Sequence, residues 1–378
     1  MTRPLTVAPE PVPPPPPTLQ AIDRALAELR RGGTVIVCDA AGHAVAAQAA
    51  EAATPETMAR LEALGGGTLA LAVTGRRAAV LGLAEPGGAV VVVKVPSGFD
   101  AAAVRRLADP CAADAGDLPA GLVVAAAEAD SAVTGAVALA KLARLLPAAV
   151  VTRLTGDGRL PAERQDLFRV TVAEVLSYQQ TAARTLRPVS EAQVPLAGAP
   201  QTRIVAFRPS DGGVEHLAII IGEPDRDRPV LTRLHSECFT GDLLGSLRCD
   251  CGDQLRGAIS EIAQDGSGVL LYLAQEGRGI GLVNKLRAYR LQDLGFDTLD
   301  ANEQLGFDDD ERIYLPAAEM LRQLGIARVR LLTNNPQKVE ALARHDIEVS
   351  ERVPHVFPAN DHNEYYLRTK AVRSGHLF

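Results

Sequence analysis

Three cysteines in the second half of the chain have the spacing of a metal site. Cys238, Cys249 and Cys251 form the pattern C-x10-C-x-C. Three thiolates with a fourth position left to water are typical of a catalytic zinc, because the open position can hold and acidify a nucleophile. If His235 closed the tetrahedron, the site would instead be a structural Cys3His zinc. The spacing fits both alternatives. The basic residues that flank the cluster favour the catalytic one, since they suit phosphate groups: Arg233, Arg248 and Arg256.

A second group of polar residues follows a predicted strand. The segment Gln275-Glu-Gly-Arg-Gly-Ile-Gly281 is Gly-rich and opens a predicted helix, which is consistent with an anion at a helix N-terminus. It has neither the GxGxxG spacing of a dinucleotide fold nor the lysine of a P-loop. Further along come Tyr289, Thr298, the acidic run within 306–312 and the segment 331–338.

Four separated motifs between residues 189 and 377 resemble GTP cyclohydrolase II, the family that opens the guanine ring of GTP at the start of riboflavin synthesis. They are HSEC-x10-CDC, QEGRGIGL-x2-K, NEQLGFDDDER and LLTNNPQK. The resemblance implies zinc-dependent hydrolysis of GTP to 2,5-diamino-6-(5-phosphoribosylamino)pyrimidin-4(3H)-one, formate and pyrophosphate.

The resemblance also implies a role for individual residues. One zinc per chain would be bound by Cys238, Cys249 and Cys251. Asp310 takes the place of the family's proposed base, Arg312 its proposed nucleophile, and Tyr289 the residue beside the reacting carbon. The implied GTP-contacting residues are Arg233, Leu234, His235, Ser236, Glu237, Gln254, Glu276, Gly277, Arg278, Thr298, Thr333 and Lys338.

Elementary chemistry supports most of these roles. Opening guanine between N9 and C8 needs water delivered to an electron-poor carbon, and zinc can activate that water near neutral pH. Glu276 can accept hydrogen bonds from guanine N1–H and N2–H together. Lys338 and Arg278 suit the triphosphate, with Mg2+ bridging its oxygens. A guanidinium with a pKa above about 12 is a poor nucleophile. Arg312 therefore either attacks the α-phosphate with help from Asp310 or stabilises that phosphate electrostatically.

Two competing hypotheses are a related enzyme acting on another nucleobase compound and a zinc-stabilised module that binds GTP without turnover. The intact Glu276, Tyr289, Asp310 and Arg312 argue against the first. Tight GTP binding without formate release would identify the second. Three of the four acidic residues from Asp308 to Glu311 are expected to be merely solvated.

Residues 19–187 resemble the dihydroxybutanone phosphate synthase domain that commonly precedes GTP cyclohydrolase II on one chain. The resemblance rests on the order and spacing of three segments: Gly33–Val37, Ala49–Glu56 and Leu154–Arg159. That family holds a divalent metal with a dense acidic segment and a histidine. Here Asp39 is the only acid of the segment, and residues 120–150 contain no histidine. We therefore predict a degenerate domain without synthase activity that provides a dimer surface or support. Removing residues 1–185 should leave GTP turnover chemically possible, at a cost in stability or assembly.

Length and composition set the limits for the whole chain. A length of 378 residues predicts two domains, and 47% apolar with 22% charged residues exclude a mainly disordered chain. A net charge of −7 argues against a sequence-independent nucleic-acid binder. No stretch approaches about 18 uninterrupted apolar residues, and no secretory leader is visible. We expect a cytoplasmic enzyme, a homodimer, with GTP as its partner and neither membrane nor nucleic acid.

The elements that position these residues alternate in type, which predicts a mixed α/β fold of two domains. We expect a Pro-rich disordered tail over 1–18, the synthase-like domain over 19–187 and the GTP cyclohydrolase II domain over 188–378. Strands are predicted at 34–38, 89–95, 121–125, 217–221, 269–273 and 329–333. Helices are predicted at 19–29, 134–146, 253–263, 281–294 and 315–324.

Overall fold

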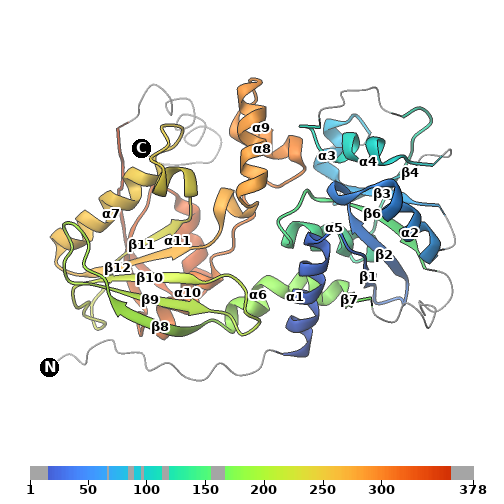
Figure 1. Cartoon of the computed structure of the whole chain (residues 1–378). Helices are drawn as coiled ribbons and strands as arrows, with labels where there is room; N and C mark the ends of the chain where they lie inside the picture. Colours follow the sequence, from blue (N-terminus) through green and yellow to red (C-terminus); the bar gives the residue numbers. More distant parts are fainter. Residues whose placement is uncertain are drawn as a thin grey trace. The chain divides into compact units, whose positions relative to one another are not determined.

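The chain forms two compact units in the computed structural model (Figure 1). The model describes residues 16–65, 68–83, 89–94, 98–112, 119–154 and 167–358. The first unit, here called the amino-terminal unit, comprises Pro16–Tyr178 together with Gly279–Glu311. The second, here called the cysteine unit, contains Gln179–Arg278 and the chain from Arg312 onward. Residues 279–311 thus pack with the first half of the sequence, although they lie inside the second.

The amino-terminal unit is built on a seven-stranded sheet of order β5-β4-β3-β6-β2-β1-β7, in which only β1 and β7 pair in parallel. Its strands are β1 (Val35–Cys38), β2 (Ala44–Ala49), β3 (Ala70–Thr74), β4 (Val90–Lys94), β5 (Val123–Ala126), β6 (Ala148–Arg153) and β7 (Arg169–Thr171). Its helices are α1 (Pro17–Arg30), η1 (Ala50–Ala52), α2 (Pro55–Gly65), α3 (Gly75–Val80), α4 (Ala101–Ala108), α5 (Ala132–Leu142), α8 (Leu282–Asp293) and α9 (Thr298–Leu305), and α6 (Val172–Arg184) crosses into the cysteine unit.

Small and β-branched side chains make this unit's core. Alanine and valine predominate in the central strands, and β2, β3 and β6 are buried almost throughout, as strands covered on both faces should be. One apolar cluster contains Leu61, Leu71 and Val104, and another contains Leu26, Val37 and Leu139. The core therefore depends on close approach of many small groups rather than on large aromatic side chains.

The cysteine unit is built on a second seven-stranded sheet, of order β14-β13-β11-β12-β10-β9-β8. The four strands from β14 to β12 are parallel and the other pairs are antiparallel. Its strands are β8 (Arg187–Gln193), β9 (Thr202–Arg208), β10 (His216–Ile221), β11 (Val230–Ser236), β12 (Gly268–Leu273), β13 (Arg328–Leu332) and β14 (Glu348–Val353). Its other elements are η3 (Phe239–Leu243), α7 (Cys251–Asp265), η4 (Glu276–Gly279, whose last residue belongs to the other unit), α10 (Leu315–Gln323) and α11 (Pro336–Ala343).

The mixed α/β fold predicted from the sequence is confirmed, and each predicted strand and helix has a counterpart within a few residues. The helix predicted to run to Leu146 ends at Leu142, because the following turn contains Arg144 with a φ of 60°. Pro17 and Thr18, placed in the predicted tail, begin α1, where proline suits the first helical turn. Residues 1–15 of that tail, Val95 and the segment 155–159 lie outside the described residues. In the described part of the chain, no helix is long and apolar enough to cross a membrane.

Candidate metal centre and nucleotide site

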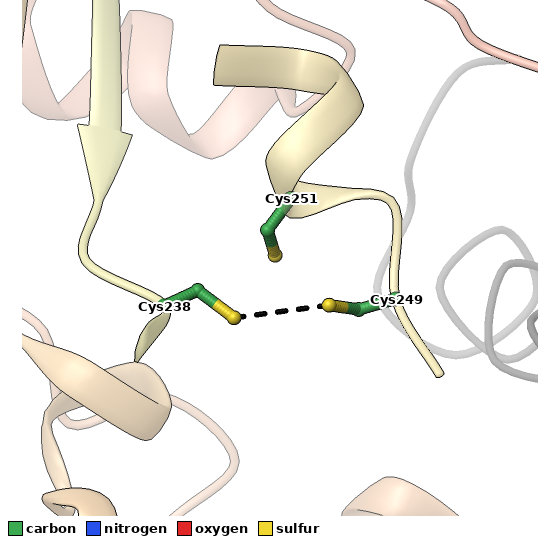
Figure 2. A group of neighbouring side chains, drawn as sticks. All are labelled: Cys238, Cys249 and Cys251. Atoms are coloured by element: carbon green, nitrogen blue, oxygen red, sulfur yellow. Dashed lines mark hydrogen bonds between the residues drawn. The ribbon is translucent and has the colours of Figure 1, made fainter. Parts of the chain in front are cut away.

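The three cysteine sulfurs of the predicted metal site lie together (Figure 2). Cys238 follows the end of β11, and Cys251 opens α7 with Cys249 in the turn before it. The three Sγ atoms all lie within 4.8 Å of one another, and those of Cys238 and Cys249 are 3.7 Å apart. Two sulfurs bound to a tetrahedral zinc at about 2.3 Å each would be about 3.8 Å apart. The sulfur positions thus suit a tetrahedral metal ion.

A glycine between the first two cysteines leaves room for the sulfurs to approach one another. Gly241 lies in η3, and a Cβ on it would fall 2.8 Å from the Sγ of Cys249 and 3.1 Å from that of Cys238. Any other residue would therefore displace the sulfurs. Without a cation the close thiols hold their protons: contact with Cys238, together with burial, raises the pKa of Cys249 to about 11. A bound divalent cation reverses this preference by stabilising the thiolates.

Asp242, which sequence reasoning did not identify, organises the residues around Cys238. Its carboxylate accepts hydrogen bonds from the backbone N–H of Cys238 at 2.9 Å and from the Tyr272 hydroxyl at 2.9 Å. It also lies 3.1 Å from Nε2 of His235. The side chain is only 6% exposed. No sequence motif indicates the role of this carboxylate, because the π-helical turn η3 is what brings it to the backbone of Cys238.

His235 is not part of the sulfur cluster. Among the described residues the three cysteines form the group of three or more side chains that could hold a metal ion, and His235 Nε2 faces Asp242 instead. The ring stacks on Tyr272 with centroids 5.6 Å apart. Burial lowers the pKa of His235 despite the opposing effect of Asp242. Of the two alternatives left open by the spacing, the geometry favours three thiolates with a fourth position open.

Several predicted GTP-contacting residues of the cysteine unit are buried and bonded to the protein. The guanidinium of Arg233 donates to the Leu332 carbonyl at 3.0 Å and to the Gln254 side chain, and burial lowers its pKa to about 10. Lys338 donates to the Leu234 carbonyl at 2.8 Å. Thr333, 1% exposed, accepts the N–H of the nearby Asn335. These side chains lie along the carboxyl ends of the parallel strands β11 and β13, the usual ligand-binding edge of such sheets.

Glu276 and Ser236 connect the metal centre to the Gly-rich turn. The Glu276 carboxylate, 4% exposed, accepts the N–H of Phe239 at 2.6 Å and that of Gly277 at 2.9 Å. Ser236 Oγ lies 3.4 Å from a guanidinium nitrogen of Arg312. The turn itself is left-handed, with φ of 60° at Arg278 and 63° at Gly277. A non-glycine residue held in this region often marks a functional site.

Three predicted site residues belong to the amino-terminal unit. Tyr289 lies on α8, with the Lys285 ammonium 5.6 Å from its ring centre. Thr298 opens α9 and accepts a hydrogen bond from Gln292 at 3.2 Å. Asp310 follows α9 in the acidic run. The structure thus divides the predicted set between two units, a distribution that the sequence motifs did not reveal.

The prediction that most of the acidic run is merely solvated was wrong. Asp308 pairs with Arg76 at 2.7 Å and with Lys141 at 3.4 Å, and Glu311 pairs with Lys141 at 2.7 Å. Burial would raise the pKa of Asp308, but these two cations together hold it below its usual value. The partners come from the first half of the sequence and could not be inferred from the run itself.

Together, the fold and site define a mixed α/β protein with a buried three-thiol centre at the ligand-binding edge of a partly parallel sheet. The GTP cyclohydrolase II family model matches residues 187–354. A GTP cyclohydrolase-2 from Azospirillum brasilense is 59% identical over 363 residues, which are 95% of this chain and 94% of the relative. The chain belongs to the GTP cyclohydrolase II family.

Other relatives cover smaller shares of the chain or are less identical to it. A GTP cyclohydrolase-2 from Yersinia pseudotuberculosis is 54% identical over 192 residues, 51% of this chain and 97% of the relative. The riboflavin biosynthesis protein RibBA of Synechocystis is 44% identical over 64% of this chain and 45% of its own length. Among solved structures, RibBX, a two-domain 3,4-dihydroxy-2-butanone 4-phosphate synthase from A. baumannii, covers 89% of this chain and 99% of its own at 18% identity and a TM-score of 0.34.

Proposed function

We propose that this chain is a zinc-dependent enzyme that converts GTP and water to formate, pyrophosphate and the diaminopyrimidinone ribosylamino phosphate, the first step of riboflavin synthesis. The observation that carries the proposal is the packing of the Cys238, Cys249 and Cys251 sulfurs at tetrahedral spacing with His235 outside the cluster. The names of the Azospirillum and Synechocystis relatives support the same substrate and pathway. The proposal includes a cytoplasmic homodimer, as the family resemblance implies.

The three sulfurs would hold one zinc with a free position, and the metal would there acidify the water needed for attack on C8 of guanine. The residues around it have separate tasks. Glu276 accepts from the guanine N1–H and N2–H: each carboxylate oxygen already accepts one backbone N–H and has a second lone pair. Tyr289 orients the water or passes a proton at C8.

The phosphate end of GTP is assigned to basic groups and to Asp310. Lys338 and Arg278 bind the triphosphate together with Mg2+. Arg312 acts at the α-phosphate with Asp310. The hydrogen bond from Arg312 to Ser236 suits a protonated guanidinium, which supports electrostatic stabilisation over covalent attack.

The proposal treats the amino-terminal domain as inactive in synthase chemistry. Asp39, the only acid of the segment that should hold the metal, is engaged locally. Its carboxylate accepts the N–H of Ala41 at 3.0 Å and of His43 at 2.9 Å, and it lies 3.3 Å from the His43 ring. A carboxylate that closes its own turn in this way is a poor replacement for a set of metal ligands.

Incubation of the purified full chain with GTP, zinc and Mg2+ tests the proposal when formate and pyrophosphate are measured separately. Release of both in equal amounts is the expected result. Tight GTP binding with neither product would instead identify a nucleotide-binding module.

A further inference from the structure

A buried arginine with no place in the proposed reaction lies in the amino-terminal unit. Arg77 of α3 is 4% exposed, and burial lowers its pKa to about 10, so it stays charged at neutral pH. Its Nε donates to the Leu107 carbonyl at 2.8 Å and its Nη1 to the Gln304 carbonyl at 2.9 Å. Next to it, the Thr74 hydroxyl donates to the Gly306 carbonyl at 2.7 Å. The bonds to Gln304 and Gly306 therefore satisfy carbonyl groups at the C-terminal end of α9, where a cation is also favoured by the helix dipole, while the bond to Leu107 ties Arg77 to α4.

Two further cations hold the acidic run that follows α9. Arg76 pairs with Glu303 at 3.0 Å and with Asp308 at 2.7 Å. Lys141 of α5 pairs with Glu311 at 2.7 Å, and Glu311 in turn accepts the N–H of Asp308 at 2.8 Å. Because residues 308–311 are all acidic, they would repel one another without these cations.

Ion pairs and a buried hydrogen bond also hold α8, in the first part of the segment 279–311. Arg287 of α8 pairs with Glu51 at 3.4 Å and with Asp109 at 3.5 Å. Asn284, fully buried, donates to the Arg144 carbonyl at 3.1 Å. Between the polar contacts lies an apolar cluster in which one leucine from the first half, Leu146, meets side chains of the segment: Ile280, Ala288, Leu291, Ala301, Leu305 and Phe307. Figure 1 shows α9 beside α3, with α8 packed on α9.

We propose that the amino-terminal domain is a scaffold that positions the segment 279–311, with Lys141, Arg76 and Arg77 as positioning residues that fix Asp310 through its neighbours. The inference rests on the proposed function for the role of Asp310. It assigns a task to a domain whose own metal ligands are missing, because the basic side chains that it presents match the acidic run in charge and position. Residues 19–187, which form this domain, thus contribute to GTP turnover without touching GTP.

The full-length Lys141→Glu variant tests this inference. The substitution replaces the ion pair with a carboxylate beside Glu311 and Asp308, both partly exposed, so the variant should fold. We expect kcat for GTP to fall at least about tenfold, equivalent to about 1.4 kcal/mol in the barrier, with a much smaller change in KM and full zinc content. Amide hydrogen exchange over residues 298–311 should become faster.

Three further variants control for general effects of charge and folding. Lys141→Glu combined with Glu311→Lys restores an opposite-charge pair and should recover most of the lost kcat, as should Lys141→Arg alone. Arg31→Glu makes the same type of charge change at a residue that is 67% exposed and pairs with Glu28 at 3.1 Å, and it should behave as wild type.

The outcomes separate this inference from the proposed function. Two results overturn the scaffold. One is a Lys141→Glu variant with wild-type kcat and unchanged exchange over 298–311, and the other is a kcat loss that persists when Glu311→Lys is added and is equally large in Lys141→Arg. If the wild type releases no formate, the proposed function fails, and the exchange measurement alone then decides whether Lys141 holds the segment.

Discussion

Replacing Asp242 with asparagine should weaken both the fold and the metal centre. The carboxylate is 6% exposed and faces three donor groups: the Cys238 N–H, the Tyr272 hydroxyl and His235 Nε2. An amide has one acceptor oxygen and an NH2 group, so at least one of these donors loses its partner. Hydrogen bonds to a charged group contribute about 1.5–3 kcal/mol each, and we therefore expect the free energy of unfolding to fall by about 2–3 kcal/mol.

The effect on zinc follows from the bond to Cys238. Because Asp242 fixes the backbone that carries this sulfur, its loss should weaken zinc affinity by roughly 10–100-fold, the usual effect of removing a group that orients a ligand. Urea unfolding and competition with a chromogenic chelator measure the two quantities. Tyr272→Phe, which removes one of the three donors, should cost about 1 kcal/mol. Asp253→Asn, an exposed carboxylate on α7, is the control and should change stability by less than about 0.5 kcal/mol. Wild-type zinc affinity in Asp242→Asn would refute the reasoning.

The remaining predictions concern the two ends of the substrate, pH and the first domain. Cys249→Ser should lose zinc and formate release while slow pyrophosphate release continues and GMP accumulates. The control Cys38→Ser should keep its zinc and its formate release. Equal loss of formate and pyrophosphate in a folded Cys249→Ser protein would show that zinc organises the whole site. Arg312→Ala should suppress pyrophosphate, measured by a coupled phosphate assay. Because the pKa of His235 is lower in the folded state than in the unfolded state, the unfolded chain binds more protons below about pH 6.5. Stability should therefore fall from pH 7 to 5 more steeply in wild type than in His235→Asn, and parallel urea midpoints would count against this. The full chain should form no dihydroxybutanone phosphate from ribulose 5-phosphate with Mg2+; detectable product would show that the missing acids do not matter.

The sequence was most informative where residue type and spacing decide the chemistry. The C-x10-C-x-C pattern located the sulfur cluster, because closely spaced cysteines of this kind are typical of zinc ligands. The hydrophobic runs located six of the fourteen strands that the described residues form. The order of the strands in the sheets depends on long-range contacts that no local pattern carries. The sequence did not indicate Asp242, because its contact with the Cys238 N–H depends on a π-helical turn that no residue pattern predicts.

The division of the predicted site residues between the amino-terminal unit and the cysteine unit could not be predicted from the sequence either. Tyr289 and Asp310 lie among the four motifs of the second half, so the sequence predicted one domain over 188–378 that contains them. Their packing depends on Arg77 and Lys141, more than 150 residues earlier. Nothing in a basic pair on a short helix or a lysine on an Ala-rich helix indicates which acidic run it will meet. On this packing we expect removal of residues 1–185 to impair turnover by loosening the segment 279–311.

Formate release from metal-free and zinc-reconstituted full-length protein tests the central claim most directly. The account predicts that protein stripped of metal releases no formate from GTP. One equivalent of zinc per chain should restore release, and the Cys249→Ser variant should not respond. Formate release without metal, or none after stoichiometric zinc uptake by the wild-type thiols, would contradict it.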